Sequence, residues 1–251
     1  MNAAGLAIAA TAAAGAAVIN SAAGGGSFIS FPALVFLGVP PITANATNTA
    51  AMWIGQVGSI RGFREDMMRP TPRFVAAMIV SAAGGIAGAV LLLHTSQQAF
   101  NAVIPWLLLL ATVLFAVAPG ILKLAHHPGD VDDVRWDSVV PLFAIAVYGG
   151  YFGGGQGLLL LAYFALIGMT NLRRMNGFKA ILAAINNGVP VIPFVIARAL
   201  AWDVAFAMCV GAVIGGYYGA RLTRLVPARV VRVGIVVIGA AMTAAFFARS
   251  R

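Results

Sequence analysis

The sequence predicts an all-α polytopic membrane protein made of two inverted-topology repeats of about five helical elements each, with broken or re-entrant helices at Gly-rich turns. Three observations support this fold class. Of the 251 residues, 61% are hydrophobic and only 9% are charged, whereas about 25% of the residues in a water-soluble protein are charged. The apolar stretches are long and nearly uncharged, as in helices that cross lipid. The same order of long, short and Gly-broken stretches also occurs twice along the chain.

The apolar stretches form two sets of five, separated by the most hydrophilic segment of the chain. The first set covers roughly 3–23, 27–38, 44–60, 74–93 and 101–122, and the second covers roughly 138–152, 156–168, 176–197, 203–220 and 230–248. We therefore divide the chain into a first transmembrane repeat (1–123), a linker (124–137) and a second transmembrane repeat (138–251). The first stretch has no Lys or Arg before it, so we expect a retained helix and not a signal peptide.

A Gly triplet ends the first stretch of each half, at residues 24–26 and 153–155. A short stretch of about a dozen residues follows each triplet and ends at Gly38 or Gly168. Corresponding features of the two halves are separated by about 129–131 residues throughout. Repeats with interrupted helices at corresponding positions are typical of secondary transporters.

The distribution of positive charge predicts the orientation of the chain. If the loop at 61–73 is cytoplasmic, the linker, the Arg173-Arg174 turn and the loop at 221–229 are also cytoplasmic. About thirteen of the 16 Lys and Arg residues then face the cytoplasm, in agreement with the positive-inside rule. We expect a multi-pass protein of the bacterial cytoplasmic (inner) membrane, with the linker inside, both termini outside and the two halves oppositely oriented.

The residues after each triplet open new helices and suggest an anion site. An unpaired backbone N–H in hydrocarbon costs several kcal/mol, so a break is tolerated where it is buried or lines a wet cavity. Helix N-termini at Ser27 and at Gln156-Gly157 would offer free N–H donors and a partial positive charge. Close helix packing is the alternative interpretation of a Gly triplet. Two triplets at one spacing, each opening a short helix, favour a substrate site near the membrane midplane.

Polar side chains at membrane depth add possible ligands. Lys179 can bind the anion or extend its ammonium to the cytoplasmic interface, and both remain open. Gln56 is expected to hydrogen-bond a neighbouring helix instead. All seven acidic residues fall in or beside loops, so a cation site would lack negative ligands. The candidate substrate-binding residues are Asn20, Gly24, Gly25, Gly26, Ser27, Asn48, Thr49, Gly153, Gly154, Gly155, Gln156, Gly157, Lys179, Asn186 and Asn187.

These patterns resemble a known family. The sequence Gly-Gly-Gly-Ser at 24–27, followed by Gly-Val-Pro at 38–40 and Ala-Asn-Ala-Thr-Asn at 44–48, is similar to the TauE/SafE sulfite exporter family of membrane permeases. The run at 149–157 and Asn-Gly-Phe-Lys at 176–179 are similar to the second repeat of that family. The resemblance implies export of a sulfur-containing anion such as sulfite or a small organosulfonate (sulfoacetate, for example). A channel or permease for another small oxyanion or organic acid is the alternative.

Other functions lack the motifs that they require. The sequence has no Ser–His dyad, HExxH spacing or paired intramembrane carboxylates, so we expect no enzyme. His126 and His127 are expected to lie in a solvated linker, and we predict no metal and no cofactor. A scaffolding protein would not need polar, Gly-broken helices at symmetric positions. The expected partners are a small anionic substrate and the lipid bilayer, with no nucleic acid because no basic stripe carries interleaved aromatics.

Overall fold

The structure is a computed structural model that describes every residue except 23, 63–70, 125–133, 135–137, 223–227 and 250–251. Most of the described residues are helical, and none of them lies in a strand. The helices are α1 (Ala3–Ala22), α2 (Ser27–Phe36), α3 (Pro41–Gly62), α4 (Pro72–His94), α5 (Gln97–Leu124), α6 (Val139–Tyr151), α7 (Gln156–Leu166), α8 (Leu172–Gly188), α9 (Val191–Ile196), α10 (Trp202–Leu222) and α11 (Ala228–Arg249). Five helical segments of the described chain are long and apolar enough to cross a bilayer. The predicted all-α polytopic membrane fold is thus confirmed.

One predicted stretch is divided in the structure. The apolar run at 176–197 forms two helices, α8 and α9, which are separated by a turn at Val189-Pro190. Pro190 has no N–H with which to continue the hydrogen-bond ladder of α8, so the helix ends before it. Each of the other nine predicted stretches corresponds to a single helix. Most of the predicted linker, and with it His126 and His127, lies outside the described residues.

The short helices α2 and α7 end in the same way. Gly38 has a φ of +88° and Gly168 has a φ of +97°, a left-handed conformation that favours glycine. The N–H of Val39 donates to the carbonyl of Leu34 at 3.0 Å, and the N–H of Met169 donates to the carbonyl of Phe164 at 3.0 Å. These bonds close a Schellman cap at each helix end. With 10 and 11 residues, each helix is about 15 Å long, half of the hydrocarbon thickness.

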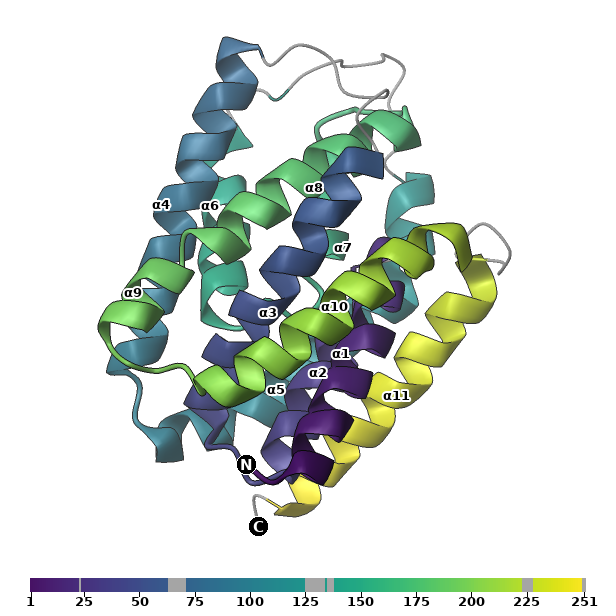
Figure 1. Ribbon diagram of the computed structural model, residues 1–251. Coiled ribbons are helices and arrows are strands. Elements are labelled where there is room, and N and C mark those ends of the chain that lie inside the picture. The colour runs from purple at the N-terminus through teal and green to yellow at the C-terminus, as the bar shows by residue number, and fades with distance from the viewer. Residues whose placement is uncertain (23, 63–70, 125–133, 135–137, 223–227, 250–251) are drawn as a thin grey trace.

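Helices of the first half contact corresponding helices of the second half. The helix of the first predicted stretch of each half packs against the helix of the fourth predicted stretch of the other half, as α1 does with α10 and α6 with α4. The third elements, α3 and α8, contact each other, and so do the last elements, α5 and α11. Figure 1 shows α1, α10 and α11 on one side of the molecule and α4, α6 and α9 on the other. This pattern is expected of two repeats related by a two-fold axis, whereas their opposite orientation in the bilayer stays a prediction.

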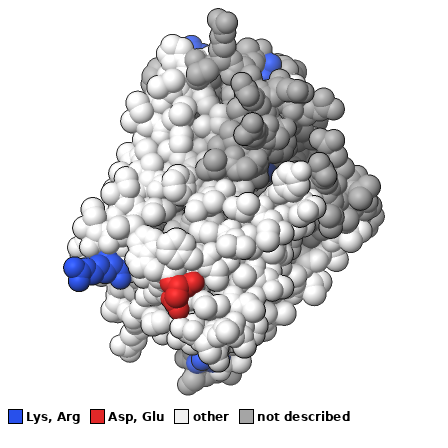
Figure 2. All heavy atoms as spheres, viewed as in Figure 1, with Lys and Arg blue, Asp and Glu red and all other residues white. Residues whose placement is uncertain are grey.

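Charge is sparse on the surface, as the composition predicts. Figure 2 shows a face on which most of the described surface is uncharged and the few charged side chains stand apart from one another. The N-terminus and the end of α11 lie at one end of the molecule, and the beginnings of α4 and α8 lie at the other (Figure 1). An apolar band between two ends is the arrangement that a bilayer requires.

Aromatic packing holds the short helix α2 in the interior. Phe31 is fully buried, and its ring lies 5.5 Å from the ring of Phe152 and 6.3 Å from that of Phe246. Phe28 meets Phe115 edge-on at 5.6 Å. Each such pair contributes about 0.5–1.5 kcal/mol beyond its burial. These contacts join α2 to α5, α6 and α11 and thereby fix the position of the first Gly break.

Glycines four residues apart allow close contact in the helix pairs that join the two halves, α1 with α10 and α4 with α6. A Cβ at Gly211 or Gly215 of α10 would overlap the backbone of Ala10 or Ala14 of α1. A Cβ at Gly88 of α4 would likewise overlap the backbone of α6 at Val147. Small residues at this spacing allow the backbones of membrane helices to approach closely, and dispersion between the backbones then stabilises the pair.

We therefore expect Gly215→Leu to destabilise the protein by about 1–3 kcal/mol or more, because the leucine forces α1 and α10 apart. The measurement is the thermal unfolding midpoint of the purified protein in detergent. Gly234→Leu is the matched control, since a Cβ at Gly234 of α11 meets nothing within 4 Å. Equal midpoints for the two variants would contradict the close α1–α10 packing.

Candidate substrate site

The two Gly breaks touch each other in the interior of the protein. Gly24 follows α1 and has a φ of +80°. A Cβ built on Gly24 would lie 3.1 Å from the Cα of Gly157, and a Cβ on Gly157 would lie 3.2 Å from the Cα of Gly24. Two backbones can approach so closely because neither residue has a side chain. The break before α2 and the first turn of α7 therefore form one continuous wall.

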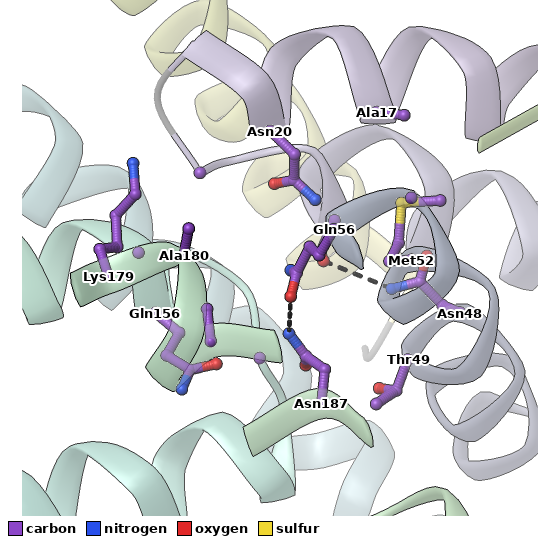
Figure 3. Close-up of a pocket in the computed structure, with 16 residues that line it drawn as sticks. Ala17, Asn20, Asn48, Thr49, Met52, Gln56, Gln156, Lys179, Ala180 and Asn187 are labelled. Atoms are coloured by element: carbon purple, nitrogen blue, oxygen red, sulfur yellow. Dashed lines mark hydrogen bonds between the residues drawn. The ribbon is translucent and has the colours of Figure 1, made fainter. Parts of the chain in front are cut away.

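A cavity of about 50 Å³ opens beside this contact, between α1, α2, α3, α7 and α8 (Figure 3). The structure brings ten of the candidate residues together around it. They are Asn20, Gly24, Ser27, Asn48, Thr49, Gly153, Gln156, Gly157, Lys179 and Asn187. The remaining lining residues are Ala17, Met52, Gly55, Gln56, Ala180 and Ala183.

Matching faces of α3 and α8 form two opposite sides of the cavity. The α3 face carries Asn48, Thr49, Met52 and Gln56, and the α8 face carries Lys179, Ala180, Ala183 and Asn187. Each residue of the second face follows its counterpart on the first by the same spacing, which is 131 residues for Gln56 and Asn187. This last pair is hydrogen-bonded, with the Nδ2 of Asn187 donating to the Oε1 of Gln56 at 3.0 Å. The cavity thus lies where corresponding positions of the two halves meet.

Four candidate glycines shape the breaks but do not line the cavity. They are Gly25, Gly26, Gly154 and Gly155. A Cβ at Gly25 would lie 2.6 Å from the ring of Phe115, and a Cβ at Gly154 would lie 2.6 Å from the ring of Phe152. Gly155 has a φ of +77°, the left-handed conformation from which α7 starts. For these four positions the packing interpretation of the triplets accounts for the glycine.

Asn186 also lies outside the cavity wall, and it positions a residue that lines it. The side chain is fully buried, and its Nδ2 donates to the backbone carbonyls of Ser81 at 3.0 Å and Ala146 at 2.9 Å. Its Oδ1 accepts from the Nε2 of Gln156 at 2.7 Å. Asn186 therefore ties α8 to α4 and α6 and holds the Gln156 amide in one orientation.

Polar groups of the first break face the cavity. The Nδ2 of Asn48 donates to the Oγ of Ser27 at 3.3 Å. Asn20 lines the cavity and also caps the break, since its Oδ1 accepts from the N–H of Gly26 at 2.9 Å. The backbone N–H groups of Ser27 and Gly157, in the first turns of α2 and α7, have no hydrogen-bond partner among the described residues. Backbone donors at helix N-termini favour an anion.

Lys179 is the only charged side chain among the described residues in the wall of the cavity. It is 7% exposed, so its ammonium stays in the interior and does not extend to the protein surface. Its Nζ donates to the Oδ1 of Asn176 at 2.8 Å. Asp203 is the one acidic residue in the described part of the chain, and it forms an ion pair at the start of α10. The cavity therefore carries a positive charge without a carboxylate from the described residues beside it.

Gln56 was assigned by sequence only to a contact between helices. That contact exists, with Asn187, but Gln56 lines the cavity as well. Its position could have been found from helical spacing, because Asn48, Met52 and Gln56 succeed one another at intervals of four residues and so share one face of α3. The alanines and Gly55 carry no polar signal that sequence reasoning could use.

Comparisons with known proteins agree with the membrane fold. The family model described as sulfite exporter TauE/SafE matches residues 8–246. A probable membrane transporter protein, ORF9, of a Sinorhizobium species is 27% identical over 218 residues, which cover 86% of this chain and 82% of the relative. The probable membrane transporter protein YfcA of Escherichia coli strain K12 is 26% identical over 225 residues, which cover 87% of this chain and 81% of the relative. No solved structure shows a significant match.

Proposed function

Because the chain belongs to the TauE/SafE family of sulfite exporters, we propose that this multi-pass membrane protein exports sulfite, or a small organosulfonate such as sulfoacetate, across the bacterial cytoplasmic membrane. The observation that carries the proposal is the buried cavity where the two Gly breaks meet, in which Lys179 is the only charged residue of the part of the chain that the structure describes. An unpaired buried cation is costly, and a bound anion removes that cost.

The geometry suggests how the anion is held. Sulfite oxygens would accept from the ammonium of Lys179 and from the backbone N–H groups of Ser27 and Gly157, which have no partner among the described residues. Hydrogen bonds from charged donors and from helix N-termini are about twice as strong as neutral ones. The side-chain amides of the α3 and α8 faces complete a polar wall around the ligand.

The size of the cavity favours sulfite over the larger organosulfonates. A cavity needs about 10–15 Å³ to hold one water molecule. A cavity of about 50 Å³ therefore accommodates roughly three to five atoms or groups of the size of a water molecule. Sulfite has one sulfur and three oxygens and fits this space. Sulfoacetate adds a methylene and a second anionic group, so the cavity must widen to admit it.

The membrane potential supports transport in the outward direction. With the inside negative, each negative charge that leaves the cell gains about 2.3 kcal/mol per 100 mV. In the proposed orientation, with the linker at 124–137 cytoplasmic and both termini outside, the anion enters from the side that carries most of the positive charge. The acidic residues of the chain lie in or beside loops, so the interior has no evident carboxylate for proton or cation coupling.

The experiment that tests the function is flux into proteoliposomes that contain the purified protein. We expect uptake of labelled sulfite to exceed that of sulfate and of sulfoacetate, because the cavity is small, and to exceed the leak of protein-free liposomes. A sodium or proton gradient should not be required. Failure to transport any of the three anions would overturn the substrate assignment, and an absolute need for a cation gradient would overturn passive export.

A further inference from the structure

The cavity wall contains hydrogen-bond acceptors that an anion without a proton cannot satisfy. Gln156 is 3% exposed and Asn48 is 1% exposed, and both line the cavity. The Oε1 of Gln156 and the Oδ1 of Asn48 have no hydrogen-bond partner among the described residues. A buried acceptor without a donor is costly, and a ligand that carries a hydrogen removes that cost.

The orientation of the Gln156 amide is fixed by its neighbours. The Nδ2 of Asn186 donates to two backbone carbonyls, which cannot donate in return, so the Oδ1 of Asn186 must face Gln156. Only the Nε2 of Gln156 can donate to that oxygen, and its Oε1 is left on the other side of the amide. Figure 3 shows this oxygen on the side of Asn187 and the nitrogen turned away.

Asn48 has no such constraint. Its Nδ2 bonds to the hydroxyl of Ser27, and a hydroxyl can either accept or donate. The Asn48 amide can therefore turn and present its NH₂ to an anion. Among the described lining amides, Gln156 remains the one whose unpartnered acceptor is held in place by bonds that cannot be reversed.

The charge count points to the same ligand. Lys179 contributes one positive charge to the cavity, and no acidic side chain among the described residues lines it. A singly charged anion gives a neutral buried complex, whereas a doubly charged anion leaves one negative charge without a partner.

We propose that the site binds the oxyanion in its protonated, singly charged form, HO–SO₂⁻ (hydrogensulfite), with its O–H donating to the Oε1 of Gln156. The inference rests on the proposed function and narrows it to one ionisation state. Lys179 and the N–H groups of Ser27 and Gly157 take the charged oxygens. The transported ion then carries its own proton, and no bond is broken or formed during transport.

The titratable groups around Gln156 are few. The elements packed against α7 and α8 are α3, α4, α5, α6 and α9. The titratable side chains that the structure describes on them and on α7 and α8 themselves are Arg73, His94, Tyr148, Tyr151, Tyr163, Arg174 and Lys179. Of these only Lys179 lines the cavity, so a pH effect on binding comes from the ligand or from this lysine.

Binding to the purified full-length protein, measured by calorimetry, tests the inference. The second ionisation of sulfite lies near neutral pH, so we expect the affinity for total sulfite to fall by about tenfold per pH unit on the alkaline side. Methanesulfinate, CH₃–SO₂⁻, has the same shape and charge with a methyl group in place of the O–H. Its affinity should stay constant over this range, which controls for ionisation of Lys179, and should be about tenfold weaker than that of hydrogensulfite.

Gln156→Met removes the acceptor at similar side-chain volume, and the measured quantity is the ratio of the two affinities. We expect the preference for hydrogensulfite to disappear. Gln98→Met on the exposed surface of α5 is the matched control and should keep the preference for hydrogensulfite.

If the Gln156 variant does not fold, the comparison of the two ligands and the pH series on the unaltered protein test the inference without it. Sulfite affinity that is constant or rises with pH would overturn the protonated-ligand inference and leave the proposed function standing, whereas no sulfite binding at any pH would overturn the proposed function itself.

Discussion

Lys179→Met is expected to lower sulfite flux in proteoliposomes by at least about 30-fold, because it removes the one charge that the described residues place in the cavity wall. The side chain is buried and lies beside Asn176, and no carboxylate among the described residues lines the cavity. An anion that enters the variant loses its water without gaining a counter-charge. Methionine keeps the length of the side chain, so the packing of α8 is largely preserved.

Two further variants separate charge from shape. Lys179→Arg keeps the charge but puts a wider, planar group into a small cavity, and we expect an intermediate loss of flux. Arg198→Gln removes a positive charge from an exposed position between α9 and α10 and should leave the flux unchanged. Flux of the Lys179→Met protein within about threefold of the unaltered protein would show that charge is recognised elsewhere.

Gly157→Val is expected to reduce flux to the level of protein-free liposomes. The Cβ would be 3.2 Å from the backbone of Gly24 and 3.5 Å from the Cδ of Lys179, so the side chain separates the two breaks and fills much of a cavity of about 50 Å³. The measurement is sulfite uptake together with the amount of folded protein recovered by size-exclusion chromatography.

The matched control is Gly15→Val on α1, where a Cβ meets nothing within 4 Å. We expect this control to transport at the rate of the unaltered protein. Substitutions at Gly25 or Gly154 would not test the site in the same way, since both lie against aromatic rings and not in the cavity wall. Normal flux through a folded Gly157→Val protein would contradict the location of the site.

The fold class and the position of the breaks could be predicted because both follow from local sequence. Long uncharged runs predict helices in lipid, and the left-handed glycines at 38 and 168 mark the ends of the two short helices. The division of α8 from α9 was missed because a continuous apolar run hid the effect of Pro190. A proline predicts the end of a helix because it has no backbone N–H, and a hydropathy profile does not show this effect.

The candidate site was predicted in part, and the reason for its limits is geometric. Asn186 and Asn187 are neighbours on α8, but successive residues of a helix point about 100° apart. One side chain therefore binds α4 and α6 while the next faces the cavity. The three members of a Gly triplet also face different neighbours. Sequence alone does not show that Gly24 is the one that contacts Gly157.

The pairing of α1 with α10 and of α4 with α6 has a mechanical consequence. The first helix of each half packs mainly against a helix of the other half. The backbones in these pairs are in such close contact that separating them would cost much of their packing energy. We therefore expect any part of the protein that moves as a rigid body during transport to contain helices from both halves of the polypeptide. The predicted linker at 124–137 separates two repeats in the sequence, but the described helices of the two halves pack into shared pairs. We therefore expect that neither repeat expressed alone forms a functional transporter.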